Sequence, residues 1–284
     1  MKILVINPGS TSTKIALFNN EDLVFEHKLD HAIDQNFQQQ FGKIGNVFDQ
    51  YPYRLEQILK ILTEKNITQL DAVVGRGGML PPISSGTYQV NQKMLDDLRD
   101  RPQANHASNL GAPIALEIAK KFNITDKAFI VGPVTTDEIE PKHKITGFPE
   151  IKRAPGWHAL NQKAVCREYA KSINKRYEDL NLICAHLGGG FSFGAHKKGK
   201  TINVINATSG EGPITPERSG QIPAQGLIDL CFSGKYSKEE LTKMGINDSM
   251  IHVDFMLGSN DLSIVATTQD YKKVQIFKNE NWAF

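Results

Sequence analysis

The sequence predicts an α/β fold in which one strand-rich unit occurs twice. The first observation is a glycine-bearing turn between strand-like apolar runs, which occurs near the N-terminus and again after residue 182. The second is a set of helical patterns between the two copies, and the third is a pair of buried-strand patterns that end in glycine. Helices alternating with such strands are typical of layered α/β folds. Two similar meanders indicate a duplicated domain, although chance similarity of two hairpins is an alternative.

The first copy begins with the stretch INPGSTSTKIALF, from Ile6 to Phe18. It contains the glycine, hydroxyls and lysine of the nucleotide loop GxxxxGK[ST], but no glycine precedes Lys14. A loop of that kind opens a helix. Here an apolar run follows, then the turn residues 19–22 and a second apolar run at 23–25, which is a strand pattern. The sequence therefore predicts strand, phosphate-sized turn, strand, turn and strand.

Helices and buried strands follow this meander. Apolar residues at helical spacing predict helices over Arg54–Asn66, Asn109–Phe122 and Ala159–Tyr177. Short apolar runs at 71–75 and 128–132 predict buried strands.

The second meander covers residues 182–206, with a glycine turn between its first two strands and a basic turn at 197–200. The first copy and its helices would occupy residues 1–180, which leaves only about a hundred residues for the second. We therefore expect two domains, 1–180 and 181–284, of which the second is incomplete and has a divergent tail from about residue 263.

Composition excludes several classes of protein. The 284 residues are 40% hydrophobic and 23% charged, as in ordinary globular proteins, and the net charge of +2 is too small for an electrostatic nucleic-acid binder. Cys166, Cys184 and Cys231 are odd in number and form no CxxC motif, which favours reduced thiols in a cytosolic protein. No apolar run is long enough for a signal peptide or a membrane span. We expect a cytoplasmic protein that binds neither nucleic acid nor membrane.

Three ordered motifs resemble those of the butyrate kinases. They are residues 7–14 (NPGSTSTK), 186–190 (HLGGG) and 217–220 (ERSG), and the stretches HASNLGAPIA, HALNQKA and GLIDLCFSGKY add to them. The resemblance extends from Met1 to about Leu262. It implies a duplicated actin-like, ribonuclease H-like ATPase fold with a central cleft, of the acetate kinase group. It also implies phosphoryl transfer from ATP, with Mg²⁺, to butyrate or a similar short-chain fatty acid, reversibly giving ADP and an acyl phosphate.

A carboxylate nucleophile is already ionised at neutral pH, so the reaction requires positioning and cations rather than a strong base. By resemblance, Arg76 and Arg218 flank the carboxylate and the transferring phosphoryl group. Arg76 follows a buried strand among glycines, and Arg218 lies in a loop rich in glycine and proline. Most arginines are surface or loop-anchoring residues, which is the alternative for both.

Three histidines are further candidates. The resemblance implies that His186, at the end of a predicted strand, stabilises the transferring phosphoryl group, and that His158 is a second active-site histidine. Each could instead be structural, His158 as the residue at a helix start. His106 is as consistent with a structural role as with a functional one.

The resemblance also implies a magnesium site and two phosphate turns. Asp137 and Asn7 would place the ion, although Asp137 could instead be a helix N-cap. The turns would bind phosphates through backbone amides and hydroxyls. Their residues are Gly9, Ser10, Thr11, Ser12, Thr13 and Lys14 in the first turn, and Gly188, Gly189 and Gly190 in the second.

After Leu262 the resemblance ends, and the glycine-rich segment that holds the adenosine in the family has no counterpart. A catalytically inactive, truncated remnant is therefore the alternative to an active kinase. Exposed apolar surface on the second domain is then expected. A regulatory relative of the sugar kinases is a third, weaker interpretation. The family implies a homo-oligomer, which is doubtful for this chain, and acyl-chain length stays open.

Overall fold

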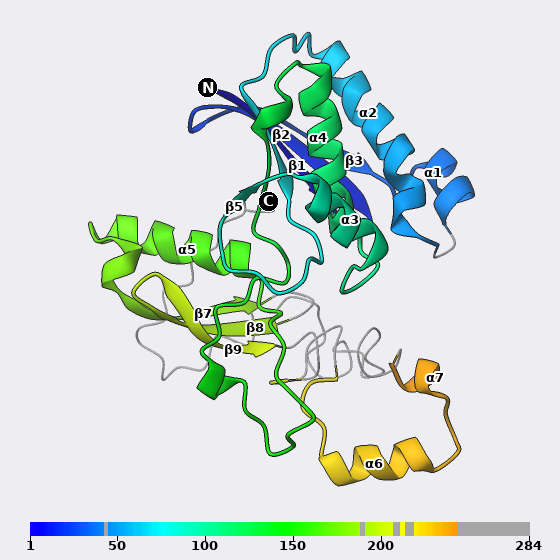
Figure 1. The fold of residues 1–284 in the computed structure, drawn as a ribbon, viewed down its shortest axis with the longest axis vertical. Helices are drawn as coiled ribbons and strands as arrows, with labels where there is room; N and C mark the ends of the chain where they lie inside the picture. Colours follow the sequence, from blue (N-terminus) through cyan, green and yellow to red (C-terminus); the bar gives the residue numbers. More distant parts are fainter. Residues whose placement is uncertain (43–44, 188–190, 207–210, 214–218, 243–284) are drawn as a thin grey trace, which may run out of the picture. The chain divides into compact units, whose positions relative to one another are not determined.

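The computed structural model describes residues 1–42, 45–187, 191–206, 211–213 and 219–242. The chain divides into two compact units, Met1–Asp137 and a second that begins at Glu138 (Figure 1). Within the described ranges, no helix combines the length and the apolar character needed to cross a membrane.

The first unit is built on a mixed sheet of six strands in the order β3-β2-β1-β4-β6-β5. β1 pairs antiparallel with β2, and β2 with β3, which gives the predicted meander. β4 and β6 run parallel to β1, so the carboxyl ends of these three strands lie at one edge of the sheet. The strands are β1 Lys2–Pro8, β2 Ser12–Asn19, β3 Asp22–Asp30, β4 Ala72–Arg76, β5 Thr87–Gln89 and β6 Ala128–Val131.

Four α-helices and three short 3-10 helices complete the described part of this unit. The α-helices are α1 Gln35–Phe41, α2 Tyr51–Glu64, α3 Gln92–Asp100 and α4 Gly111–Lys121. The 3-10 helices are η1 Val47–Gln50, η2 Ala107–Leu110 and η3 Thr125–Lys127. The predicted helices in this unit are confirmed, although α2 begins three residues before Arg54 and α4 begins two residues after Asn109.

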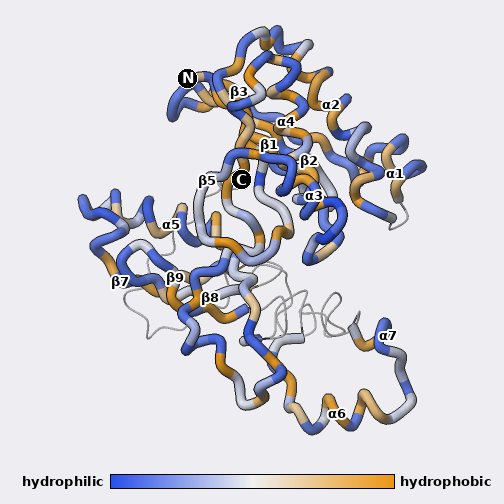
Figure 2. Tube along the Cα trace, viewed as in Figure 1, coloured by the Kyte–Doolittle hydropathy of each residue, from blue (hydrophilic) through white to orange (hydrophobic). Residues whose placement is uncertain are grey.

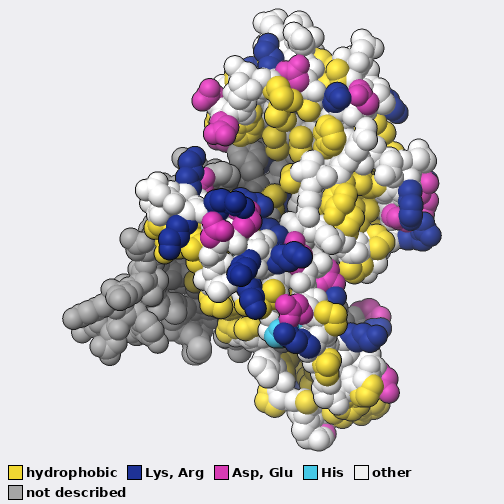
Figure 3. All heavy atoms as spheres, turned by 60° about the vertical axis from the view of Figure 1, so that its left-hand side comes forward, with side chains coloured by type: hydrophobic (Ala, Val, Ile, Leu, Met, Phe, Trp, Pro, Cys, Tyr) yellow, Lys and Arg dark blue, Asp and Glu magenta, His cyan; other side chains and the backbone are white. Residues whose placement is uncertain are grey.

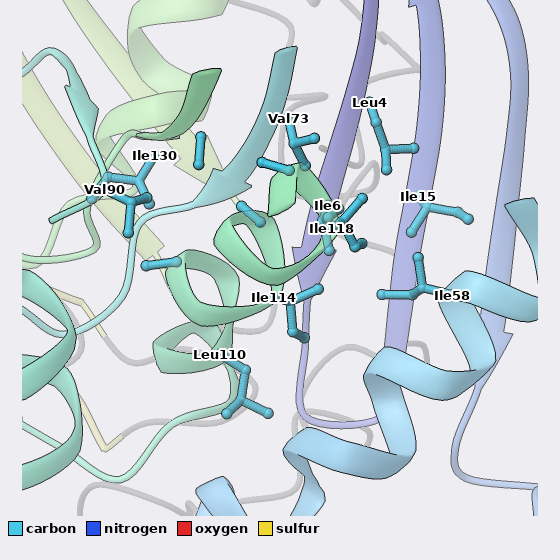
Figure 4. Close-up of a cluster of buried hydrophobic side chains, with 14 of the residues drawn as sticks. Leu4, Ile6, Ile15, Ile58, Val73, Val90, Leu110, Ile114, Ile118 and Ile130 are labelled. Atoms are coloured by element: carbon cyan, nitrogen blue, oxygen red, sulfur yellow. The ribbon is translucent and has the colours of Figure 1, made fainter. Parts of the chain in front are cut away.

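The core of the first unit lies between the sheet and helices α2 and α4 (Figure 4). Leu4 and Ile6 of β1 face Ile58 of α2 and Ile114 of α4, and all four side chains are fully buried. Figure 2 shows the same concentration of apolar residues along β1 and α4. Burial of these aliphatic side chains therefore fixes both helices over the strands that carry the candidate site.

Close backbone packing positions the end of β4. A β-carbon on Gly75 would collide with the backbone of Gly111, and one on Gly77 would collide with Pro133. The glycines around Arg76 therefore allow the close approach of α4 and of the segment after β6.

The second unit contains a three-stranded antiparallel sheet in the order β7-β8-β9. Its strands are β7 Asn181–Leu187, β8 Phe191–Lys197 and β9 Lys200–Asn206, which confirms the second predicted meander. The helices are η4 Pro141–His143, α5 Ala159–Ser172, η5 Tyr177–Asp179, α6 Ala224–Phe232 and α7 Lys238–Thr242. The predicted helix over 159–177 therefore ends at Ser172, and Tyr177 lies in a separate 3-10 turn.

The two meanders differ in what covers them. β1 pairs with β4 on the edge away from β2, whereas among the described strands β7 pairs with β8 alone. The side chains of Ile183 and Leu187, on one face of β7, are 78% and 56% exposed. Exposed apolar surface, expected for the second domain, is therefore present on β7.

The unit boundary at residues 137–138 lies well before residue 180, where the sequence analysis ended the first domain. Helix α5 packs on β7, so its contacts group it with the second meander. The expected division into 1–180 and 181–284 was based on the internal repeat and not on compactness. It stays a prediction.

On the face of the molecule in Figure 3, basic side chains lie beside acidic ones and do not form a patch of a single sign. This mixture fits the small net charge of +2.

Candidate active site

The predicted phosphate turn is a tight connection between β1 and β2. Pro8 pairs with Thr13 in the β1–β2 register, and the Gly9 amide donates to the Ser12 carbonyl at 2.7 Å. The Thr11 carbonyl accepts from the His31 amide at 2.9 Å, which ties the turn to the end of β3. Ser10 and Thr11 are exposed, so their hydroxyls are open to a ligand. The turn therefore has the hairpin form that the sequence predicted.

Thr13, in contrast, points into the protein. Its side chain is fully buried, and its hydroxyl oxygen accepts from Arg54 Nη1 at 2.8 Å and lies 2.8 Å from His31 Nε2. The prediction that the Thr13 hydroxyl binds phosphate is therefore wrong. Alternate residues of a strand point to opposite faces, and Thr13 lies on the face that points inward. Lys14 follows it, opposite Asn7 in the register of the two strands.

Arg76 ends β4 at the carboxyl edge of the parallel strands, next to Asn7 near the end of β1. Its Nη1 donates to Asn7 Oδ1 at a long 3.5 Å. Burial lowers the pKa of Arg76, and within the described residues no ion pair of this guanidinium with a carboxylate is found. A half-buried cation without an acidic neighbour favours an anionic ligand.

Asp137 follows β6 and a tight turn, with its backbone amide donating to the Ile83 carbonyl at 2.8 Å. It does not cap a helix, because the next helical residues are Pro141–His143. Its half-buried carboxylate and the Asn7 amide oxygen are the hard oxygen donors that Mg²⁺ prefers, and the few protein ligands match an ion that keeps most of its waters. The donor set therefore fits magnesium.

His106 is an N-cap. Its Nδ1 accepts from the Ser108 amide at 3.1 Å at the start of η2, so its ring proton lies on Nε2. Burial, with the charges of Arg76 and Arg54, lowers the pKa of His106 and keeps the ring neutral. The structural alternative that the sequence analysis left open for His106 therefore takes the form of a helix N-cap.

In the second unit, His158 and His186 stack with ring centroids 3.8 Å apart and planes 16° from parallel. His158 has φ 54°, a left-handed conformation that is uncommon for a residue with a β-carbon, and it immediately precedes α5. His186 lies near the end of β7. The structure thus brings together the two histidines that the resemblance assigned to the active site.

Hydrogen bonds hold both rings of this pair in place. Ser192 Oγ accepts from Gln162 Nε2 at 2.9 Å and lies 2.8 Å from His158 Nδ1. His186 Nδ1 donates to Asn161 Oδ1 at 2.8 Å, which leaves Nε2 as the acceptor, and burial lowers the pKa of His186.

Behind the histidine pair lies a buried polar cluster around His196 of β8. His196 Nε2 donates to Gln162 Oε1 at 3.0 Å, and Nδ1 accepts from the Tyr177 hydroxyl at 2.6 Å. Cys166, Cys184 and His196 offer atoms within 4.8 Å of one another, a spacing that could hold a metal ion. Because both ring nitrogens of His196 already have hydrogen-bond partners, packing accounts for the cluster.

The cysteines fit the expected reduced state. Cys166 and Cys184 are buried and Cys231 is exposed, all three as free thiols. A hydrogen bond with Cys184 and burial raise the pKa of Cys166, so this side chain is a neutral thiol.

Several predicted residues lie outside the described ranges, and several important ones were not predicted. Gly188, Gly189, Gly190 and Arg218 belong to the first group. Asn161, Gln162, Ser192, Arg54 and His31 belong to the second. Arg54 had a sequence signal, because it shares the i, i+4 spacing of Ile58 and Leu62 on the apolar side of a predicted helix. Asn161 and Gln162 lie in the stretch HALNQKA, which supports the resemblance.

Comparison with known proteins gives one partial family match. The profile of the thermophilic metalloprotease (M29) family matches residues 228–282, about a fifth of the chain. Most of that segment lies outside the described residues, and the match is too short to assign the chain to that family.

Similarity to kinases extends over most of the chain. Butyrate kinase 1 of Clostridium acetobutylicum is 52% identical over 244 residues, which cover 85% of this chain and 67% of that protein. Butyrate kinase 2 of the same organism is 51% identical with the same coverage.

Solved structures show the same fold. The acetate kinase of Porphyromonas gingivalis matches with a TM-score of 0.68 at 20% identity, over 92% of this chain and 71% of that one. A propionate kinase from Francisella tularensis matches with a TM-score of 0.65 at 21% identity, over 93% and 72% of the two chains. The fold of the acetate kinase group is thereby confirmed. With half of the aligned residues identical to curated butyrate kinases over two thirds of their length, this chain belongs to the butyrate kinase family.

Proposed function

We propose that this protein transfers the γ-phosphoryl group of ATP to butyrate or a similar short-chain carboxylate in the cytoplasm, giving ADP and an acyl phosphate. The reverse reaction uses the same groups. The observation that carries the proposal is the half-buried Arg76 guanidinium at the carboxyl edge of the sheet. Among the described residues, no carboxylate forms an ion pair with it. Family membership supplies the reaction class.

Arg76 binds the anionic reactants and offsets the charge that accumulates as carboxylate and phosphate approach each other. The resemblance assigns the same role to Arg218, which lies outside the described residues. Neutral His186 is held by Asn161 through Nδ1. An anionic phosphoryl group beside the ring would offset the effect of burial on its pKa, so that Nε2 takes a proton from solvent and donates to phosphate. His158 packs against it and limits its rotation.

Asn7 and Asp137 would hold Mg²⁺, which when bound neutralises charge on the phosphates of the nucleotide. The exposed part of the Gly9–Lys14 turn presents the Ser10 and Thr11 hydroxyls to phosphate. The resemblance assigns a second phosphate-binding role to Gly188, Gly189 and Gly190, which lie outside the described residues. Thr13 has no direct contact with phosphate in this proposal.

The test is acyl phosphate formation from Mg-ATP and butyrate, trapped as the hydroxamate, by purified wild type and Arg76→Ala. Removal of one such cationic group should lower turnover by roughly a hundred- to a thousandfold. Arg99→Ala is the matched control, because Arg99 is an exposed arginine of α3 that pairs with Asp96 and Asp100. Equal turnover in wild type and Arg76→Ala contradicts the assignment.

A second candidate is a non-catalytic protein that binds phosphate or carboxylate without turnover. The exposed Ile183 and Leu187 on one face of β7 favour it, because exposed apolar surface is expected of an incomplete second unit. Folded wild-type protein without turnover, and with phosphate binding that Arg76→Ala weakens, would establish this second function.

A further inference from the structure

Arg54 is a buried cation directly behind the phosphate turn. It lies in the first turn of α2 and is 0% exposed. Nε and Nη2 donate to Gln50 Oε1 at 3.1 and 2.8 Å, and the guanidinium lies 5.3 Å from the centroid of the Phe37 ring. Its positive charge is therefore held in place by neutral groups.

The remaining hydrogen bonds of Arg54 reach both ends of the turn. Nη1 donates to the Gly9 carbonyl at 3.0 Å and to Thr13 Oγ1 at 2.8 Å. One guanidinium thus connects the last residue before the exposed Ser10–Thr11 tip with the first buried residue after it. The planar, rigid guanidinium can maintain both contacts at once, which an ammonium group cannot do in the same geometry.

Peptide geometry converts this contact into an orientation. In a planar trans peptide the carbonyl and the following N–H point in opposite directions. Because the Gly9 carbonyl points inward to Arg54, the Ser10 N–H points away from the protein interior. Outward-pointing backbone N–H groups of turns are the donors that line anion-binding concavities, and the Ser10 N–H is oriented as such a donor.

The positive charge of Arg54 also favours an anion at the outer side of the turn. Burial lowers its pKa to about 10, with no acidic group raising it, and the guanidinium remains protonated at neutral pH. Among the described residues it forms no ion pair with a carboxylate. An anion on the outer side of the turn would supply the missing negative charge.

We propose that Arg54 is a positioning residue for phosphate binding: it fixes the Gly9 carbonyl and Thr13, orients the Ser10 N–H outward and stabilises a phosphoryl anion through the turn. It does not touch the ligand. This inference rests on the proposed function only in naming the anion as a phosphoryl group of ATP or of the acyl phosphate.

The test compares wild type with Arg54→Met, which keeps an unbranched apolar stem and removes the charge, and with Arg54→Lys. Ile58→Ala is the matched control, because it creates a cavity in the same helix without touching the turn. Each variant is assayed well below its unfolding temperature. The readouts are the KM for ATP and for butyrate, and direct calorimetric binding of pyrophosphate.

Arg54→Met should weaken pyrophosphate binding and raise the KM for ATP by tenfold or more, with the KM for butyrate nearly unchanged. Arg54→Lys should recover part of this loss, and Ile58→Ala should change neither affinity. Pyrophosphate or ATP affinity equal to wild type in folded Arg54→Met overturns the inference. If Arg54→Met does not fold, wild-type affinity in Arg54→Lys together with a conformationally unchanged turn overturns it equally.

The two proposals fail separately. Turnover with an ATP KM that Arg54 replacements leave unchanged overturns the positioning role and leaves the kinase function intact. Pyrophosphate binding that depends on Arg54, in a protein without turnover, supports the positioning role and contradicts the kinase function. A wild type that neither turns over nor binds pyrophosphate overturns both.

Discussion

Acidification should destabilise the first unit through His31. This ring is buried, stacks on Phe37 and lies 2.8 Å from Thr13 Oγ1. Thr13 Oγ1 also accepts from Arg54, and its hydroxyl proton is available to an unprotonated His31 Nε2. Burial, and then the charge of Arg54, lower the pKa of His31 to about 4.

The sign follows from proton linkage. Between pH 6.5 and pH 4 the unfolded chain binds a proton at His31 and the folded chain does not, so stability falls as the pH falls through this window. With an unfolded pKa of 6.5 and a folded pKa of about 4, the loss is about 2 kcal/mol at pH 5 relative to high pH. It approaches roughly 3 kcal/mol below the folded pKa.

The assay is urea unfolding at pH 7 and pH 5, followed by circular dichroism, for wild type and His31→Gln. The variant should lose about 2 kcal/mol less between the two pH values, whatever its stability at pH 7. His27→Gln, which removes an exposed histidine of β3, is the matched control and should follow the wild type. Equal pH dependence in wild type and His31→Gln would refute the argument, as would a His31 proton resonance that titrates near pH 6.5.

Two further results are expected in the second unit. Asn161→Leu removes the acceptor of the His186 Nδ1 proton and should lower turnover by about ten- to a hundredfold, because one buried donor is left unsatisfied. In a His186→Gln background the same substitution should add little. Additive losses would contradict the inference that Asn161 acts through His186. Ile183→Lys on β7 should change the free energy of unfolding by less than about 0.5 kcal/mol and reduce aggregation, because the side chain is 78% exposed. A large loss of stability would show instead that this face is covered in solution.

The two meanders and the main helices could be predicted from the sequence, because apolar periodicity and turn residues are local properties. The glycine turn after β1 was identified as a hairpin turn for the same reason: an apolar run, and not a helix, follows Lys14. The motif at residues 7–14 also identified the family correctly, since its residues are contiguous in sequence.

Which face a residue of these motifs presents was decided by the tertiary structure. Thr13 belongs to the phosphate motif, yet the twist and pairing of β2 bury it against Arg54 and His31, 41 and 18 positions along the chain. The stacking of His158 on His186 likewise depends on the packing of α5 against β7. No local pattern records such distant contacts.

The sequence by itself determined the fold class, the family and the residue types of the candidate site, because these are written in short motifs and in periodicity. Only the tertiary structure decided which of those side chains face a ligand and which are held inside, and that Arg54 supports the turn from behind. The physical reason is that burial and hydrogen-bond partnership arise when the chain has folded and brought distant residues together.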